Sequence, residues 1–302
     1  MDLRALESLR AVHTQGGVTA AAAVLHLTPS AVSQQLATLS RDVGMALTER
    51  VGRGLRLTPA GLALAEAAGD VAVAVERARA ACHTFLGEPT GTVRISAFQS
   101  GAQLLLPGLL TRVRRLDGIR LECSDEDVAQ EDFAALTDRI DIVIAHRSDQ
   151  GVGAASGGAV QVVPLLREPV DVAVPLDHPL AGRSSVHPRD LADQEWIAVR
   201  EGFPVAGMLH ALAVLSGAPA RVTHRINDFH VVADLVTAGH GVSLLPRYTF
   251  AGHPGLRLVP LTGIRPERRV EALLRPDRAE RLVVRRVLDE LLALAAELVE
   301  PG

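Results

Sequence analysis

Apolar residues in the first sixty positions recur at helical spacing in short runs. The first run places a large side chain at every third position: Leu3, Leu6, Leu9 and Val12. Gly16 and Gly17 end this helix, and an alanine-rich helix follows that Thr19 is expected to cap. A further helix comes after a short turn, so the pattern predicts a helix-turn-helix.

The second helix of this motif has a clear beginning in the sequence. Thr28 is placed to cap it, and Pro29 suits the first helical position, where the N–H that proline lacks would be unpaired anyway. Val32, Leu36 and Leu39 form an apolar stripe, and the opposite face is polar. Residues early in such a helix meet base edges in the major groove, which gives four candidate DNA contacts: Pro29, Ser30, Ser33 and Gln34. An ordinary polar face in solvent is the alternative.

Residues 50–57 predict a β-hairpin, because glycines separate two short arms of alternating polarity. Arg50, Arg53 and Arg56 give this hairpin a positive rim. Arg53 lies between glycines, and its side chain is expected to make few packing contacts. It is therefore the best candidate for contact with a phosphate or a narrow minor groove. Arg50 and Arg56 could equally pair with nearby acids.

Residues 60–88 predict a long helix that pairs with a second copy of itself. Apolar and small residues alternate at spacings of four and three, which is the pattern of a coiled-coil seam. The predicted seam consists of Leu64, Ala68, Val71, Val75, Ala78, Cys82 and Phe85. A helix buried on one side of a globule shows similar spacing and is the alternative, but the strict alternation favours a dimer.

Beyond residue 89 strands and helices alternate, which predicts an α/β domain. Strands are expected at 92–97, 119–123, 140–145, 170–174, 196–199, 221–226, 241–245 and 269–274, and helices at 101–116, 129–138, 206–216, 229–238 and 277–299. The nearly continuous apolar run 140–145 is typical of a parallel strand covered on both faces. Ligands bind at the carboxyl ends of such strands, which gives these candidate contacts: Phe98, Gln99, Ser100, His146, Arg147, Glu201, Phe203, Asn227 and Asp228. Each of them could instead be a surface or capping residue.

Charge is unevenly distributed along the chain, which has 302 residues and a net charge of −4. Residues 1–60 hold six Arg against four acids, a net +2 that leaves −6 for the remainder. Only the first part is therefore expected to meet phosphate. The hydrophobic fraction of 48% is sufficient for a sizeable core, and the absence of a leader-like apolar run predicts a cytoplasmic protein that does not enter the membrane.

The first sixty residues resemble the LysR-type transcriptional regulators. The resemblance is carried by the run from Ala20 to Leu36 and continues at Leu39, Gly44, Leu47, Glu49-Arg50, Arg53-Gly54 and Leu57-Thr58-Pro59-Ala60-Gly61. Looser matches follow at 91–95, 105–107, 141–145 and 236–246. The family usually has Arg at position 34, and Gln34 instead suits the N6/N7 edge of adenine. Ser40 and Thr48 also depart from the usual Glu and Phe, which affects expected helix packing.

This resemblance implies an overall architecture and function. A winged helix-turn-helix is expected at 1–59, a linker helix at 60–88, and an effector-binding domain at 89–302. That domain would contain subdomain I (about 89–164 and 265–302) and subdomain II (about 165–264), which resemble periplasmic solute-binding proteins and hold a small molecule in the cleft between them. The implied partners are double-stranded DNA carrying an interrupted palindrome, a small-molecule effector, RNA polymerase, and further copies of the chain in a dimer or tetramer.

Other functions find less support in the sequence. No catalytic elbow, zinc helix or nucleotide fingerprint occurs, so neither an enzyme nor a cofactor or metal site is expected. A transport solute-binding protein would share the second domain but not the helix-turn-helix. Cys82 and Cys123 could form a redox switch, but both are expected to be buried, and reactive thiols need exposure and a positive neighbourhood.

Overall fold

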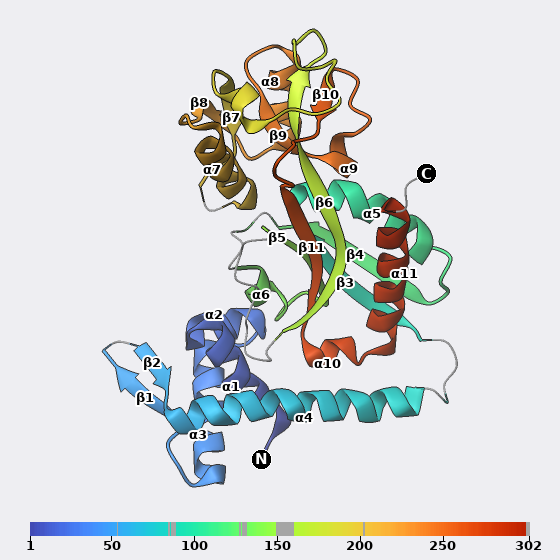
Figure 1. The fold of residues 1–302 in the computed structure, drawn as a ribbon. Helices are drawn as coiled ribbons and strands as arrows, with labels where there is room; N and C mark the ends of the chain where they lie inside the picture. The colour runs from blue at the N-terminus through green and yellow to red at the C-terminus, as the bar shows by residue number, and fades with distance from the viewer. Residues whose placement is uncertain are drawn as a thin grey trace.

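The computed structural model describes residues 1–52, 54–83, 85, 89–126, 128, 132–148, 160–201 and 203–299. The chain forms a helical head, a single long helix and a two-part α/β region (Figure 1). No helix in the described part of the chain is long and apolar enough to cross a membrane.

The head consists of α1 (Leu3–Gln15), α2 (Val18–Val24), α3 (Pro29–Val43) and the hairpin of β1 (Thr48–Val51) and β2 (Gly54–Leu57). Leu9, Leu36 and Leu39 are fully buried at its centre. Thr28 caps α3 as predicted, since its Oγ1 accepts a hydrogen bond of 3.2 Å from the Ala31 N–H. The prediction that Thr19 caps α2 is wrong: α2 begins at Val18 with Gly17 as its N-cap, so Thr19 lies inside the helix.

The long helix α4 (Pro59–His83) has 25 residues. Thr58 caps it by accepting a hydrogen bond of 3.1 Å from the Gly61 N–H. Gly61 allows α4 to approach the end of the head closely, because a Cβ there would lie 2.0 Å from the Leu47 carbonyl oxygen. Ala65 and Ala68 are buried in the head's own core, so the first half of α4 is packed against α1.

Subdomain I contains four strands and the beginning of a fifth. They are β3 (Gly91–Ala97), β4 (Ile119–Asp125), β5 (Ile142–Ser148), β11 (Glu267–Leu274) and the first half of β6 (Gln161–Pro175). In the order β6-β11-β5-β3-β4, β3 is parallel to its two neighbours and β11 is antiparallel to both of its own. The helices are α5 (Gln99–Val113), α6 (Phe133–Leu136), α10 (Pro276–Ala279) and α11 (Leu282–Val299).

Subdomain II is reached along β6 and left along β11. The second half of β6 pairs with β9 (Ser243–Pro246) and β10 (Leu256–Val259), and β7 (Glu195–Ala198) pairs in parallel with β8 (Arg221–Arg225). The remaining elements are the short helix η2 (Pro188–Leu191), α7 (Pro204–Ser216), α8 (Phe229–Thr237) and α9 (Arg247–Phe250). The two crossing strands therefore form the connection between the subdomains (Figure 1).

The structure corrects several predicted elements. The strand expected at 170–174 spans 161–175, and β10 was not predicted. The helix expected at 129–138 is limited in the described residues to α6, because the chain turns at 137–141, where arginines hold the Asp138 and Asp141 carboxylates. The final helix is divided at residues 280–281 into α10 and α11. The run at 140–145 was expected to be a parallel strand, but β5 is parallel only to β3 and pairs antiparallel with β11.

Candidate functional site

The predicted DNA contacts lie together at the exposed beginning of α3. Pro29, Ser30, Ser33 and Gln34 are all exposed, while Val32 on the opposite face is fully buried. The Ser33 hydroxyl donates a hydrogen bond of 2.9 Å to the Pro29 carbonyl oxygen. Gln34 makes no hydrogen bond to another described residue, so its amide is free to meet a partner in solvent.

The hairpin beside α3 is also exposed. Its turn includes Gly52 with φ 60°, a left-handed conformation that favours glycine. Arg50 and Arg56 are exposed, and Arg56 lies opposite Glu49 in the hairpin register. The predicted contact Arg53 lies outside the described residues.

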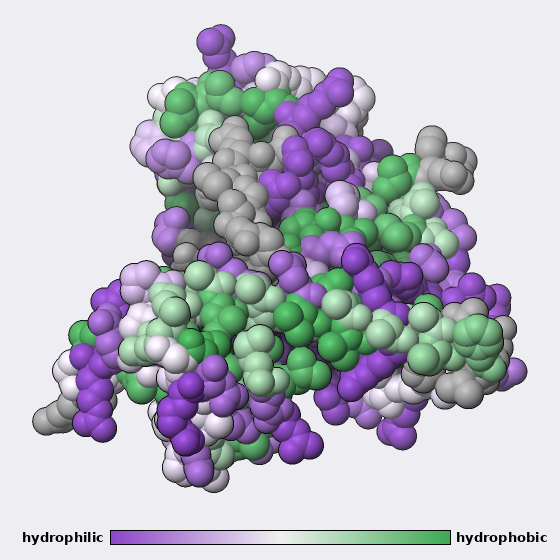
Figure 2. All heavy atoms as spheres, turned by 90° about the horizontal axis from the view of Figure 1, so that it is seen from below, coloured by the Kyte–Doolittle hydropathy of each residue, from purple (hydrophilic) through white to green (hydrophobic). Residues whose placement is uncertain are grey.

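The predicted seam of α4 divides into two halves. Leu64, Ala68 and Val71 pack against the core of their own head. Ala78, Cys82 and Phe85 are exposed, Phe85 to 91%. Seen from below, apolar residues gather along the underside of the molecule where α4 runs (Figure 2). The exposed alanines of α4 are Ala63, Ala67, Ala74, Ala78 and Ala81, and their helical spacing places them on one face of the helix.

A small cavity lies where the two subdomains meet. Its lining includes six of the residues predicted from strand ends: Phe98, Gln99, Ser100, His146, Phe203 and Asn227. Val199, Val205 and Phe229 complete it. The cavity volume is about 20 Å³, which is enough for about one water molecule. A larger molecule can enter only if the subdomains move apart.

Three helices begin at this cavity. Phe98 is the N-cap of α5 and Phe203 the N-cap of α7, and neither side chain makes a capping hydrogen bond. Phe229, the first residue of α8, also lines the cavity. The first N–H groups of a helix have no partner within it and carry partial positive charge. The beginnings of α5 and α7 therefore favour an anionic group in the cavity, whereas the Asp228 carboxylate already accepts hydrogen bonds from the first N–H groups of α8.

His146 is the buried titratable group of the cavity. Its imidazole is packed against the Phe98 ring, with ring centroids 4.1 Å apart, and meets the Phe133 ring edge to face at 5.9 Å. Burial, together with the positive charge of Arg268, lowers the pKa of His146 to about 3. The side chain is therefore neutral at physiological pH, and its buried Nδ1 has no partner among the described residues.

Two polar side chains present hydrogen-bond donors to the same space. Asn227 Oδ1 accepts a hydrogen bond of 2.8 Å from the Arg200 N–H, which directs the amide NH₂ the other way, where its buried nitrogen has no described partner. Ser100 Oγ accepts a hydrogen bond of 2.9 Å from Arg268, so its own proton remains available.

Comparison with known protein families agrees with this arrangement. Residues 3–62 match the family model described as bacterial regulatory helix-turn-helix protein, lysR family, and residues 86–296 match the LysR substrate binding domain. Together the two matches cover nearly the whole chain. The chain belongs to the LysR family of transcriptional regulators. This family binds DNA and regulates transcription, and the chain is not an enzyme.

Several LysR-type relatives extend over most of the chain. The transcriptional dual regulator GltC of Bacillus subtilis is 29% identical over 83% of this chain and 82% of its own length. OxyR of Escherichia coli is 25% identical, with 91% and 90% covered. Among solved structures, a full-length OxyR variant from Pseudomonas aeruginosa has a TM-score of 0.64 at 20% identity, covering 97% of this chain and 98% of its own. CbnR in complex with its target DNA has a TM-score of 0.55 at 20% identity, with 98% and 100% covered.

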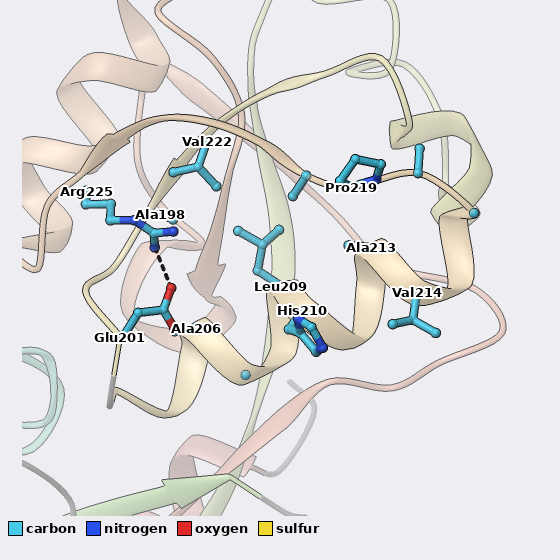
Figure 3. Close-up of a pocket in the computed structure, with 14 residues that line it drawn as sticks. Ala198, Glu201, Ala206, Leu209, His210, Ala213, Val214, Pro219, Val222 and Arg225 are labelled. Carbon is cyan, nitrogen blue, oxygen red and sulfur yellow. Dashed lines mark ion pairs between the residues drawn. The ribbon is translucent and has the colours of Figure 1, made fainter.

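In this LysR-type chain, three predicted ligand contacts do not line the cavity. Arg147 pairs with Glu271 of β11 at 2.9 Å. Glu201 pairs with Arg225 at 2.9 Å, at the end of a separate groove of about 780 Å³ along α7, where the two side chains point toward each other (Figure 3). Asp228 caps α8, and a hydrogen bond from Gln99 lowers its pKa. Because Gln99 belongs to subdomain I and Asp228 to subdomain II, this interaction links the two subdomains beside the cavity.

The prediction that both cysteines are buried is wrong. Cys82 and Cys123 are both exposed and unpaired, and neither lines the cavity. Partial burial nevertheless raises the pKa of the Cys123 thiol, which lowers its thiolate fraction.

The prediction missed the residues that lie behind the cavity wall. Arg268 stacks on the Phe98 ring, with its guanidinium 5.0 Å from the ring centroid, and pairs with Glu168 at 2.6 Å. Both of these side chains have no exposed surface. Glu168 also accepts hydrogen bonds of 3.0 Å from the backbone and hydroxyl of Thr249 in subdomain II. The sequence does contain one indication of Arg268, because an arginine stands just before an apolar run that is typical of a strand. Its partner Glu168 could not be inferred from the sequence.

Proposed function

We propose that this LysR-type regulator binds an interrupted palindrome of double-stranded DNA as a dimer or tetramer in the cytoplasm. A small anionic effector binds between subdomains I and II and changes how the two heads are presented to DNA. RNA polymerase is a further partner when the bound protein alters transcription. One observation supports the effector site most directly. Six residues that were predicted from the ends of four different strands line a single cavity at the subdomain boundary.

The exposed beginning of α3 supports direct reading of bases. Pro29, Ser30, Ser33 and Gln34 face solvent on one side of a helix whose other side is buried. A recognition helix contacts base edges through this part of its surface. The Gln34 side chain suits the N6 and N7 atoms of adenine, while Arg53 and the neighbouring hairpin arginines suit phosphates or the minor groove.

The exposed face of α4 supports self-association. Ala78 and Cys82 of the predicted seam are exposed on α4, and exposed alanines continue this surface toward the head. Phe85 is also exposed but lies beyond the end of α4 at His83, so the seam is shorter than predicted. Small side chains allow two helices to approach closely, and exposed apolar residues along one helix face are typical of an interaction surface. A second copy of α4 is therefore the proposed partner, which places two recognition helices on two half-sites.

The chemistry of the cavity supports an effector with acceptor oxygens. Asn227 and Ser100 present donors, and the uncapped beginnings of α5 and α7 add backbone N–H groups. Neutral His146 can donate from one ring nitrogen without adding charge. A small carboxylate matches this set of donors, because each carboxylate oxygen accepts more than one hydrogen bond.

A thermal-shift screen of the full chain with small mono- and dicarboxylates tests the effector site. A ligand present at a hundredfold excess over its Kd is expected to stabilise the protein by about 2.7 kcal/mol. Asn227→Leu should remove the stabilisation by the active acid, while Glu201→Gln in the separate groove along α7 should keep it. Equal stabilisation of both variants would place the ligand elsewhere.

Footprinting on the DNA beside the chain's own gene tests the regulatory part. We expect protection of an interrupted palindrome at physiological salt in the presence of competitor DNA, and a changed footprint when the active acid is added. Protection that is lost to competitor DNA would mean that binding is not sequence-specific.

A further inference from the structure

The head contacts the α/β region directly, in addition to being attached to it through α4. In Figure 1, α1 and α2 lie below α6, at the lower end of subdomain I. The contact centres on Asp138, in the turn after α6. Thr14 donates a hydrogen bond of 2.6 Å and Gln15 one of 2.5 Å to the Asp138 carboxylate.

An ion pair with the head adds to these hydrogen bonds. Arg10 lies 2.6 Å from Asp138 Oδ1, with 11% of the Arg10 side chain and 2% of the Asp138 side chain exposed. Arg10 and Thr14 are four positions apart and therefore lie on one face of α1. Both oxygens of Asp138 are thus bound by the head, and a carboxylate withdrawn from water in this way is stable only while these partners remain in place.

Arg275, between β11 and α10, provides a second anchor. Its guanidinium lies 2.8 Å from Glu7 on α1 and 2.7 Å from Asp277, and 7% of its side chain is exposed. Burial alone would raise the pKa of Glu7, but hydrogen bonds and charges from Arg10 and Arg275 lower it to about 2. Glu7 is therefore charged at every physiological pH. Arg275 also lies 3.7 Å from Asp138, so both contacts of α1 belong to one connected group of charges.

We propose that Asp138 and Arg275 are positioning residues for DNA binding. They fix α1 on subdomain I, and α1 carries α3 with it, because Ser8 of α1 donates a partly buried hydrogen bond to Gln35 of α3. The direction in which the recognition helix faces is thus set by subdomain I as well as by α4. These residues contact no base, and they act on the spacing and orientation of the two heads.

The same segment leads to the cavity between the subdomains. Three residues after Asp138, the Asp141 carboxylate is held by Arg281 at 2.7 Å and by the Arg94 N–H at 2.9 Å. β5 begins at the next residue and carries His146 to the cavity wall. A displacement of β5 by a bound effector would therefore reach the anchor of α1. This last step rests on the proposed effector site, whereas the positioning of the head does not.

Electron-spin distance measurements on the full chain, without DNA or effector, test the positioning. One spin label is attached to the exposed Cys123 of β4 and the other to Glu49→Cys of β1, in a Cys82→Ala background. Labelled chains are diluted with unlabelled ones, so that only pairs within one chain are measured. We expect one narrow distance peak, which broadens or shifts in Asp138→Asn.

The matched control is the neighbouring residue. Arg139 forms an ion pair with Glu126 but does not contact α1, so Arg139→Gln should keep the narrow peak. If Asp138→Asn fails to fold, the double variant Thr14→Val with Gln15→Ala removes the same hydrogen bonds from the head side and leaves subdomain I intact. An unchanged narrow peak in whichever of these variants folds would overturn the proposal.

Selection of binding sites from random duplexes gives a second readout, which a purely stabilising role would not change. Asp138→Asn should select the same half-site as the wild type but accept more than one spacing between half-sites. Discrimination against a spacing changed by half a helical turn should fall about tenfold, as for a typical coupling between two sites. The same half-sites at the same strict spacing would show that α4 alone positions the heads.

Discussion

Arg268 and Glu168 form an ion pair of 2.6 Å with no exposed side-chain surface, on the two strands that connect subdomain I with subdomain II. The pair also bonds to Ser100, which lines the cavity in subdomain I, and to Thr249 of α9 in subdomain II. Its two residues lie opposite each other in the β11–β6 register. The subdomain connection and the proposed effector site are therefore parts of one hydrogen-bonded arrangement.

Removing one member of this pair should destabilise the chain strongly. Arg268→Met leaves a buried carboxylate without its counter-charge, so we expect a loss of about 3–5 kcal/mol in the free energy of unfolding. Urea denaturation of the single variant and of Arg268→Met with Glu168→Leu measures this. The double variant should recover a large part of the loss, and additive effects of the two substitutions would contradict this account.

The buried His146 makes stability depend on pH. Its folded-state pKa of about 3 lies below the ordinary 6.5, so between these values the unfolded chain binds a proton that the folded chain does not. Stability is complete above pH 6.5 and falls as the pH decreases toward 3. Between pH 6.5 and 5 the free energy of unfolding is expected to fall by about 2 kcal/mol.

The variant His146→Phe provides the comparison for this pH effect. Its aromatic ring can pack against Phe98 and Phe133 without titrating. Urea denaturation at pH 7 and pH 5 should show a smaller loss of stability for the variant than for the wild type. Glu7 does not interfere, because its pKa of about 2 affects stability only below about pH 4.5. Equal losses in the two proteins would mean that His146 is accessible to protons in the folded state.

Two substitutions in the head should affect DNA binding in different ways. Gln34→Ala removes the proposed base contact and should reduce discrimination at one position by about 1–3 kcal/mol. Arg53→Ala removes the proposed contact to the DNA backbone or minor groove and should weaken binding to all sequences alike, with a salt slope smaller by about one. Competition titrations with specific and random duplexes distinguish the two effects, and the reverse pattern would refute the assignment.

A charge on the exposed face of α4 should prevent self-association. Ala78 is exposed on α4 and belongs to the predicted seam, so Ala78→Glu brings two like charges together in the dimer. Sedimentation at micromolar concentration should show a dimer or tetramer for the wild type and a shift toward monomer for the variant. Ser184→Glu, in an exposed loop of subdomain II, is the control. A monomeric wild-type protein would contradict the proposed dimer.

The head could be predicted in detail because its signals are local. Thr28, Pro29 and the stripe of Val32, Leu36 and Leu39 all lie within twelve residues, and each acts through helix geometry alone. Thr19 shows the limit of such signals, since more than one neighbouring residue can be the N-cap of a helix and Gly17 has this position in α2. Arg53 remains a prediction from sequence.

The cavity could be predicted only in part. The rule that ligands gather at strand ends located His146 but also suggested Arg147, although successive side chains on a strand point to opposite faces. Arg147 accordingly faces Glu271 on the neighbouring strand. The pairing of Arg268 with Glu168 joins residues 100 positions apart and depends on the register of β6 and β11, which no local pattern specifies.

Selection of binding sites from a pool of random duplexes, with the purified full chain at physiological salt, tests the central claim most directly. The account predicts enrichment of two inverted half-sites at one fixed spacing, with base preference at one position of each half-site weakened in Gln34→Ala. Enrichment of a single half-site, or of no sequence at all, would contradict a dimer that reads an interrupted palindrome through α3.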